Sequence, residues 1–100
     1  MKPIIFHRSA RTELDEAITY YEQQQAGLGL ALQTAVERAV RRIQQNPQLG
    51  APYKTTELRH FILQRFPYGL FYAETKDAVW IVAVAHGRRR PDYWRRRKVG

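Results

Sequence analysis

The chain contains no cysteine and no long run of apolar residues. Without cysteine there is no disulfide framework, no thiolate nucleophile and no cysteine ligand for a metal ion. The three histidines, His7, His60 and His86, lie too far apart in the sequence to form a local zinc-binding motif. We therefore expect no metal site and no cofactor.

We also expect no targeting segment and no membrane-spanning segment. The stretch before Arg11 has only a few apolar residues, too few for a signal peptide or a membrane span. We expect a cytoplasmic protein with no membrane partner. Its 100 residues, 44% of them hydrophobic, are enough for one modest core, so we expect a single domain over residues 1–100.

Acidic residues are scarce where basic residues are dense. The net charge is +8: residues 1–50 carry six basic and five acidic side chains, whereas residues 51–100 carry eleven basic and four acidic ones. Seven of the seventeen Lys and Arg residues follow residue 87. Such a region attracts RNA, DNA or an acidic protein, the alternative being a solvated basic tail.

The first half of the chain predicts one strand and two helices. β-Branched and aromatic residues over 3–7 predict a strand, and Ser9 is expected to cap a helix that ends near Gly27. Apolar residues at helical spacing predict a second helix from Leu28 to just before Pro47. The short turn between the helices makes them a helical hairpin.

The second half predicts a loop over 46–56 and then three strands, at 57–65, 68–75 and 79–85. The element order β-α-α-β-β-β predicts an α+β domain, in which the hairpin covers one face of a small, mainly antiparallel sheet. The other face is then the natural location for a site.

The C-terminal extension is expected to be helical. Pro91 is expected to start a last short helix that runs from Asp92 to Lys98. Asp92 would then lie at the positive end of the helix dipole and the arginines at its negative end.

Four phrases occur in order along the chain: SARTEL at 9–14, Asn46–Pro47 after the hairpin, RFPYGLFY at 65–72 and HGRRRPDYW at 86–94. With them the chain resembles toxins of the RelE/ParE superfamily, the toxic halves of bacterial type II toxin–antitoxin pairs. The resemblance spans nearly the whole chain. It implies a heteromeric complex with a cognate antitoxin that carries an acidic, partly disordered segment.

The superfamily has two kinds of target. RelE-like members cut messenger RNA on the ribosome without a metal ion, and ParE-like members bind DNA gyrase and trap its cleaved-DNA state without hydrolysing anything. Fold alone does not choose between them. Whether this chain is an enzyme depends on that choice.

If the chain is RelE-like, we expect its catalytic residues in the second half of the chain: Arg65, His86, Arg88, Arg90 and Tyr93. Arginines would stabilise the phosphorane, and histidine is the side chain suited to both proton transfers near neutral pH. Contacts to the target or to nucleic acid would fall to a second set: Lys54, Arg89, Trp94, Arg95, Arg96 and Arg97. The same cations are also suited to an acidic antitoxin.

Three departures favour the ParE-like function. RelE-like nucleases carry an arginine where Gly69 stands, a tyrosine where Trp94 aligns, and several lysines where Lys54 is alone. Glycine has no side chain to bind phosphate, and an indole N–H is a donor only. We therefore favour a gyrase poison, with a ribosome-dependent endoribonuclease as the alternative and a non-toxic nucleic-acid-binding module as the third possibility.

Packing roles stay open for three of these positions. His60 is expected to be a packed or surface residue, and Trp94 would cover part of the core if the C-terminal segment docks. Arg65 has the alternative of pairing with Glu57 or Glu74 across the sheet.

Overall fold

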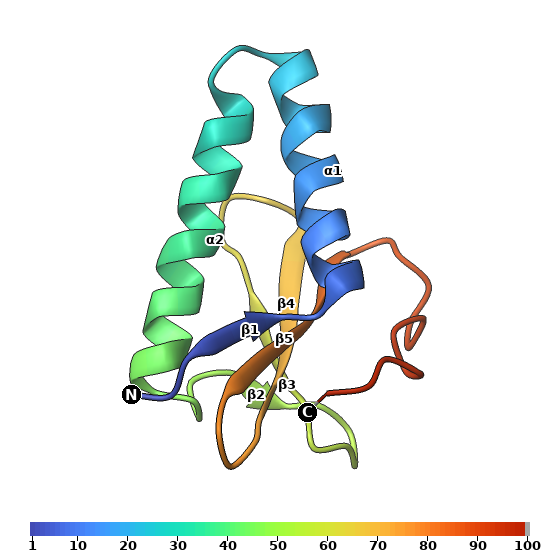
Figure 1. Cartoon of the computed structure of the whole chain (residues 1–100). Coiled ribbons are helices and arrows are strands. Elements are labelled where there is room, and N and C mark those ends of the chain that lie inside the picture. The colour runs from blue at the N-terminus through green and yellow to red at the C-terminus, as the bar shows by residue number, and fades with distance from the viewer. Residues whose placement is uncertain (100) are drawn as a thin grey trace.

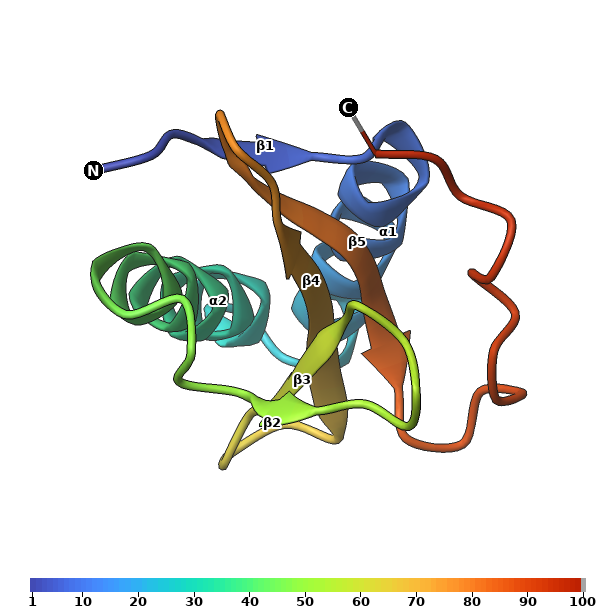
Figure 2. The same cartoon turned by 90° about the horizontal axis from the view of Figure 1, so that it is seen from below.

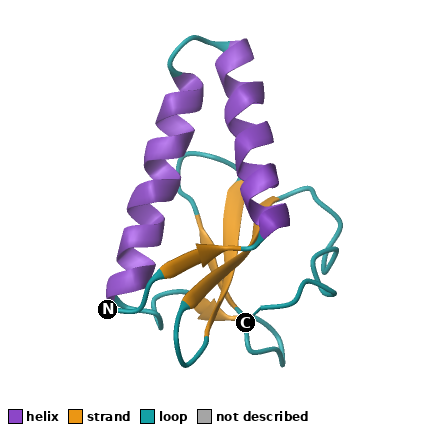
Figure 3. Cartoon of the chain, in the orientation of Figure 1, coloured by secondary structure: helices purple, strands orange, loops and turns teal. Residues whose placement is uncertain are grey.

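The computed structural model describes residues 1–99, which form a helical hairpin on a five-stranded sheet (Figures 1 and 3). The elements are β1 (Ile4–Phe6), α1 (Arg8–Gln24), α2 (Leu28–Gln45), β2 (Ala51–Pro52), β3 (Arg59–Ile62), β4 (Tyr68–Glu74) and β5 (Val79–His86). The strand order is β1-β5-β4-β3-β2, with β1 parallel to β5 and the other pairs antiparallel. The predicted α+β architecture is confirmed. Neither described helix is both long and apolar enough to cross a bilayer.

The two helices are joined by a tight turn built on Glu22 and two glycines. The Glu22 carboxylate accepts hydrogen bonds from the backbone N–H groups of Gly27 (2.9 Å) and Gly29 (3.0 Å), at the N-terminus of α2. Gly27 has φ 89°, and a Cβ on Gly29 would lie 2.6 Å from the carbonyl oxygen of Ile18. Glycine is therefore required both for the turn and for the close approach of the helices.

The start of α1 corrects one prediction. The helix begins at Arg8, and its N-cap is His7, whose Nδ1 accepts a hydrogen bond from the backbone N–H of Ser9 (3.0 Å). Ser9 is therefore inside the first turn and is not the cap. An imidazole nitrogen does here what a Ser or Asp oxygen does at most helix starts.

The main core lies between the hairpin and the sheet. Both helices bury one apolar face, and the largest fully buried side chains come from α2, β4 and β5: Leu32, Val36, Ile43, Leu70, Tyr72, Val79, Ile81 and Val84. The Tyr72 hydroxyl donates to the carbonyl of Pro47 (2.9 Å) and accepts from the N–H of Gly50 (2.7 Å). This phenol fixes the loop after α2 onto the sheet.

Two strand predictions need correction. The segment 46–56, predicted as a loop, contains the two-residue strand β2, in which Ala51 pairs with His60. The strand predicted over 57–65 is only Arg59–Ile62, so residues 63–67 form a loop before β4. β2 is a two-residue edge strand that depends on its pairing with β3, and local sequence does not reveal such pairing.

The predicted helix over 92–98 is wrong. Asp92 has φ 62°, a left-handed conformation that a right-handed helix does not tolerate. The segment instead folds into turns, with hydrogen bonds from the N–H of Arg95 to Asp92 (3.0 Å) and from the N–H of Arg97 to Trp94 (3.0 Å). Seen from below, this segment passes on the opposite side of β4 and β5 from α2 (Figure 2).

A bulge in β5 changes what its outer edge offers. Phe71 pairs with Ala83 and Tyr72 with Ile81, so Val82 is an extra residue. Pairing with β1 ends where the N–H of His7 donates to Ile81 (2.9 Å). Beyond that point the backbone groups at the edge of β5 form hydrogen bonds with side chains. The N–H of Val84 donates to Glu13 (3.0 Å), and Arg97 donates to the carbonyl of Val82 (2.9 Å).

Candidate functional site

The sheet face away from the helices carries a cavity of about 400 Å³, which we call the sheet-face cavity. It is hollow because small residues of neighbouring strands meet in its floor: Gly69 pairs with Ala85, and the N–H of Gly87 donates to the carbonyl of Pro67 (2.8 Å). Ile62, which pairs with Gly69, borders it and is 67% exposed. Because Gly69, Ala85 and Gly87 have little or no side chain, the sheet surface is recessed at these residues.

Aromatic rings form one wall of this cavity. The rings of His60 and Phe71 are stacked with centroids 4.1 Å apart and an interplanar angle of 5°. Phe71 also contacts Trp94 (4.5 Å), and Tyr53 lies edge-on to Phe71 (4.9 Å). Phe71, Trp94 and Tyr53 belong to a second apolar cluster, separate from the core under the helices.

His60 occupies the space that a side chain at position 69 would need. A Cβ built on Gly69 would lie 2.3 Å from Nε2 of His60, so only glycine fits beneath this ring. Burial lowers the pKa of His60, which keeps the imidazole neutral at neutral pH. The ring therefore brings hydrogen-bonding nitrogens to the cavity floor without bringing a charge.

The rim of the cavity is cationic. Arg89 and Arg90 border it and are exposed, whereas the one acidic residue among those lining it is Asp92. Asp92 accepts hydrogen bonds from Lys54 (2.9 Å) and from the Tyr53 hydroxyl (3.1 Å). The hydrogen bond from Lys54 lowers the pKa of Asp92, and the carboxylate in turn raises the pKa of Lys54. The charges of Lys54 and Asp92 therefore cancel, and the two arginines give the rim its positive charge.

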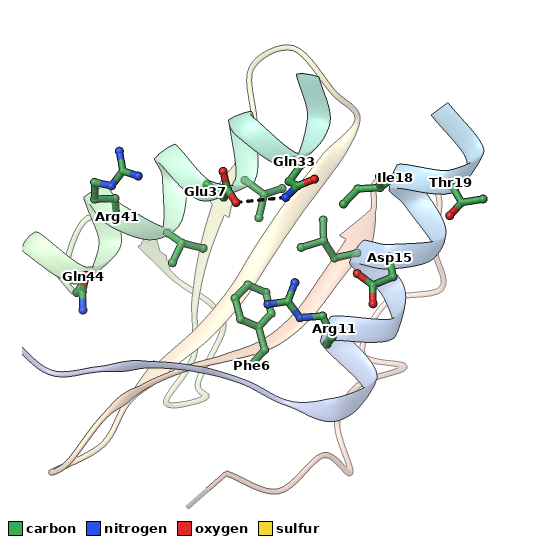
Figure 4. Close-up of a pocket in the computed structure, with 12 residues that line it drawn as sticks. Phe6, Arg11, Asp15, Ile18, Thr19, Gln33, Glu37, Arg41 and Gln44 are labelled. Carbon is green, nitrogen blue, oxygen red and sulfur yellow. Dashed lines mark hydrogen bonds between the residues drawn. The ribbon is translucent and has the colours of Figure 1, made fainter. Parts of the chain in front are cut away.

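A second hollow, the helix groove, lies between α1 and α2 and has a volume of about 690 Å³ (Figure 4). Phe6 of β1 lies at its end, with the guanidinium of Arg11 4.5 Å above the ring. Polar residues line its walls, including Asp15, Gln33 and Arg41. Its floor is apolar and comes from both helices: Leu14, Ile18, Val36 and Val40.

Residues 4–91 match the family model described as the ParE toxin of type II toxin–antitoxin system, parDE. The chain belongs to the ParE toxin family. It is 31% identical over 87 residues to Toxin ParE2 from two Mycobacterium tuberculosis strains, covering 86% of this chain and 82% of the relative. A solved structure described as the chromosomal ParDE TA system from P. aeruginosa has TM-score 0.66 at 19% identity, over 86% of this chain and 96% of that one. These findings confirm the predicted RelE/ParE resemblance and fold.

In this ParE-family chain, His86 ends β5 where the basic segment begins. Its ring lies edge-on to Tyr68 (5.1 Å), and its Nδ1 accepts a hydrogen bond from the N–H of Arg88 (3.0 Å). The side chain is half-buried and borders both the sheet-face cavity and a smaller hollow beside Glu13 of α1. Arg89 borders the same two hollows.

Arg65 is not part of this arrangement. It lies in the loop before β4, is exposed, and its guanidinium is 5.6 Å from the ring centre of Phe66. No ion pair of Arg65 occurs within residues 1–99, and Glu74 pairs with Lys2 instead (2.9 Å). The alternative pairing across the sheet is therefore not formed.

Tyr93 is held between two guanidinium groups. The ring centre lies 4.0 Å from Cζ of Arg89 and 5.1 Å from that of Arg97. Burial, together with the nearby Glu13 carboxylate, raises the pKa of Tyr93 well above its usual value. The phenol stays protonated at neutral pH, where it is not a base.

Arg97 has a structural role in an ion pair with Glu13. It donates to both carboxylate oxygens of Glu13 (2.9 and 2.8 Å), with side chains that are 15% and 11% exposed. Burial acts to raise the pKa of Glu13, but hydrogen bonds from Arg97 and from the Val84 backbone outweigh it, so the pKa is lowered. A bidentate pair of this kind anchors the C-terminal segment to α1.

The remaining predicted residues divide into two groups. Trp94 is 4% exposed and docked against Phe71, which confirms the packing prediction; its indole is part of the second cluster. Five arginines are exposed on the C-terminal segment: Arg88, Arg89, Arg90, Arg95 and Arg96. Arg95 borders a different hollow, next to Trp94 and Arg97.

Sequence reasoning missed Tyr53, Phe71 and the position of His60 as parts of the site. The alternation over 57–65 did place His60 and Ile62 on one face, which was a usable signal. It did not reveal that the register puts His60 opposite Phe71, or that Gly69 leaves room for the imidazole.

Proposed function

We propose that this protein is a growth-inhibiting toxin that acts as ParE-like toxins do, by binding DNA gyrase and trapping its cleaved-DNA state. It would act in the cytoplasm, where gyrase and its DNA are. Family membership supports the toxin function, and the choice of target rests on the residues of the site.

One observation carries the choice of a non-hydrolytic mechanism. Where an RNA-cleaving relative would place a phosphate-binding arginine, this chain has Gly69, and the ring of His60 fills the space above it. This position therefore supplies no cationic side chain, and the His60 ring leaves no room for a larger residue there. Tyr93, protonated and packed between arginines, gives no base in its place.

The experiment is a pair of assays on the purified protein. Gyrase supercoiling should be inhibited, and cleaved DNA should accumulate when the reaction is stopped with detergent and protease. A ribosome-programmed translation mix should keep its messenger RNA intact. Unaffected gyrase together with cut messenger RNA contradicts the proposal.

A second function, metal-independent cleavage of messenger RNA on the ribosome, is favoured by a different observation. His86, Arg89 and Arg90 border one cavity, as a proton donor and two phosphate ligands would. Under this function cleavage is expected to disappear in His86→Ala, with Arg38→Ala on α2 as the control. A non-toxic binding module predicts instead that induction leaves growth unchanged.

We also propose that an antitoxin neutralises the toxin through the helix groove. Its apolar floor suits the apolar face of an amphipathic segment, and its walls carry two arginines, Arg11 and Arg41, as well as two carboxylates, Asp15 and Glu37. The overall charge of +8, and not the charge of the groove, favours a partner with acidic residues. Ile18→Glu, in the groove floor, is expected to prevent neutralisation by the antitoxin from the adjacent gene while leaving toxicity intact.

A further inference from the structure

We infer that the sheet-face cavity binds one unpaired nucleotide of a single nucleic-acid strand, with its base over Ala85 and beside the His60 ring, and its phosphate against Arg89 and Arg90. This goes beyond the proposed function because it is a property of the isolated protein. It holds whether gyrase or the ribosome is the target.

The first support is the shape of the space. A volume of about 400 Å³ lies within the range of small-ligand pockets. Ala85 contributes only a methyl group to its floor, and Gly69, its partner across β4 and β5, lies under the edge of the His60 ring. A planar group can lie over Ala85, beside the imidazole of His60.

The second support is the chemistry of the walls. His60 and Tyr53 are half-buried rings that border the cavity, backed by Phe71 and Trp94. Aromatic side chains are the usual platforms for unstacked bases. The Nε2 atom of His60 lies over the floor, where it is placed to exchange a hydrogen bond with the edge of a base.

The third support is charge. Arg89 and Arg90 are exposed on the rim, and the charge of Asp92 is balanced by Lys54. The rim therefore attracts an anion, which a nucleotide has at its phosphate and an uncharged aromatic ligand lacks. A base inside a duplex is stacked on both sides and does not reach a recessed floor, so the strand must be unpaired there.

The test uses the intrinsic fluorescence of Trp94, which lines the cavity. The Trp80→Phe variant leaves Trp94 as the one remaining tryptophan. The probes are a 12-residue DNA strand, an RNA strand of the same sequence, the matching duplex, inorganic polyphosphate and an acidic peptide containing tyrosine. At equal salt, one or both single strands should change the Trp94 emission and bind about tenfold tighter than the duplex, polyphosphate or the peptide.

Two variants locate the binding. Ala85→Leu fills the floor and should weaken single-strand binding about tenfold, while Ala26→Leu in the helical turn should not. Because Ala85 is buried and its variant is at risk of misfolding, a surface pair provides a second measurement. Arg90→Gln should weaken binding several-fold and reduce its salt dependence, whereas Arg38→Gln, an equal loss of charge on α2, should change affinity less than twofold.

Three results overturn the inference. Equal affinity for polyphosphate or duplex would mean that charge alone is recognised. Tighter binding of the acidic peptide, in competition with the strand, would assign the cavity to a protein partner. Equal losses in Arg90→Gln and Arg38→Gln would place the strand elsewhere. None of these results depends on gyrase, so failure here is distinct from failure of the proposed function.

Discussion

The two faces of the sheet are covered in different ways. One face packs against α1 and α2, whose regular apolar stripes bury a continuous core. The other face is covered in part by residues 87–99, a segment of turns held by Trp94 and by the Arg97–Glu13 pair (Figure 2). The helix-covered face is built for stability, whereas the second face keeps a cavity and a cationic rim.

This difference predicts two modes of failure. Damage under the helices should unfold the whole domain, because the core there joins every long element. Damage under the C-terminal segment should release that segment first, because few contacts hold it.

The largest effect is expected for Leu32→Ala in the helix-side core. Leu32 is fully buried, so its truncation should lower the free energy of unfolding by about 2 to 5 kcal/mol. Urea unfolding followed by circular dichroism measures the change. In a Trp80→Phe background, loss of helix signal and of Trp94 fluorescence should coincide; separate transitions would show that the two faces already unfold independently.

A smaller global effect is expected for Arg97→Met. The change leaves the Glu13 carboxylate and the Val82 carbonyl without their partner, at a cost of about 2 to 4 kcal/mol to docking of the segment. Trypsin should then cut after Arg88 or Arg89 before the helices unfold. Arg96→Met, an exposed neighbour, is the control, and equal cleavage rates in both variants would contradict the anchoring role.

A smaller effect still is expected for Gly69→Ala. The new methyl group would meet His60 and force its ring away from Phe71, at a cost of about 1 to 3 kcal/mol. In a double-mutant cycle His60→Ala should relieve most of this cost. Additive losses in the double variant would mean that the imidazole does not occupy the space over Gly69.

The smallest effect concerns pH. Because the folded pKa of Glu13 is lowered, its contribution is present above its unfolded pKa, near 4.5, and is lost as the pH falls through the folded value. Docking of the C-terminal segment should therefore weaken below about pH 4. Hydrogen exchange of the residue 93–99 amides measures this, and Glu13→Gln should reduce the dependence and leave the part that is due to Asp92, whose pKa is also lowered.

The helices and the three longer strands could be predicted because their signals are local. Apolar spacing identified both helices, and the continuous apolar run from Val79 identified β5. The turn at Asp92 could not be predicted, because the left-handed residue is held by Lys54 and Tyr53, almost forty positions away. Local residues favoured a helix there, and long-range contacts decided otherwise.

The candidate site was predictable only in part. The dense arginines and His86 pointed to the end of β5, where the cavity rim lies. The cavity itself depends on the register that places Gly69 beside Ala85 and His60 beside Phe71. That register follows from strand pairing and the bulge at Val82, neither of which leaves a mark in composition or periodicity.

Growth of bacteria that express the toxin, with and without its antitoxin, tests most directly whether the two faces have separate functions. Arg90→Gln at the cavity rim is expected to lose toxicity and still bind the antitoxin in a pull-down. Ile18→Glu in the helix groove is expected to stay toxic and escape neutralisation. If Arg90→Gln stays fully toxic, or if the antitoxin neutralises Ile18→Glu as strongly as the unaltered toxin, the claim that the two faces have separate functions is wrong.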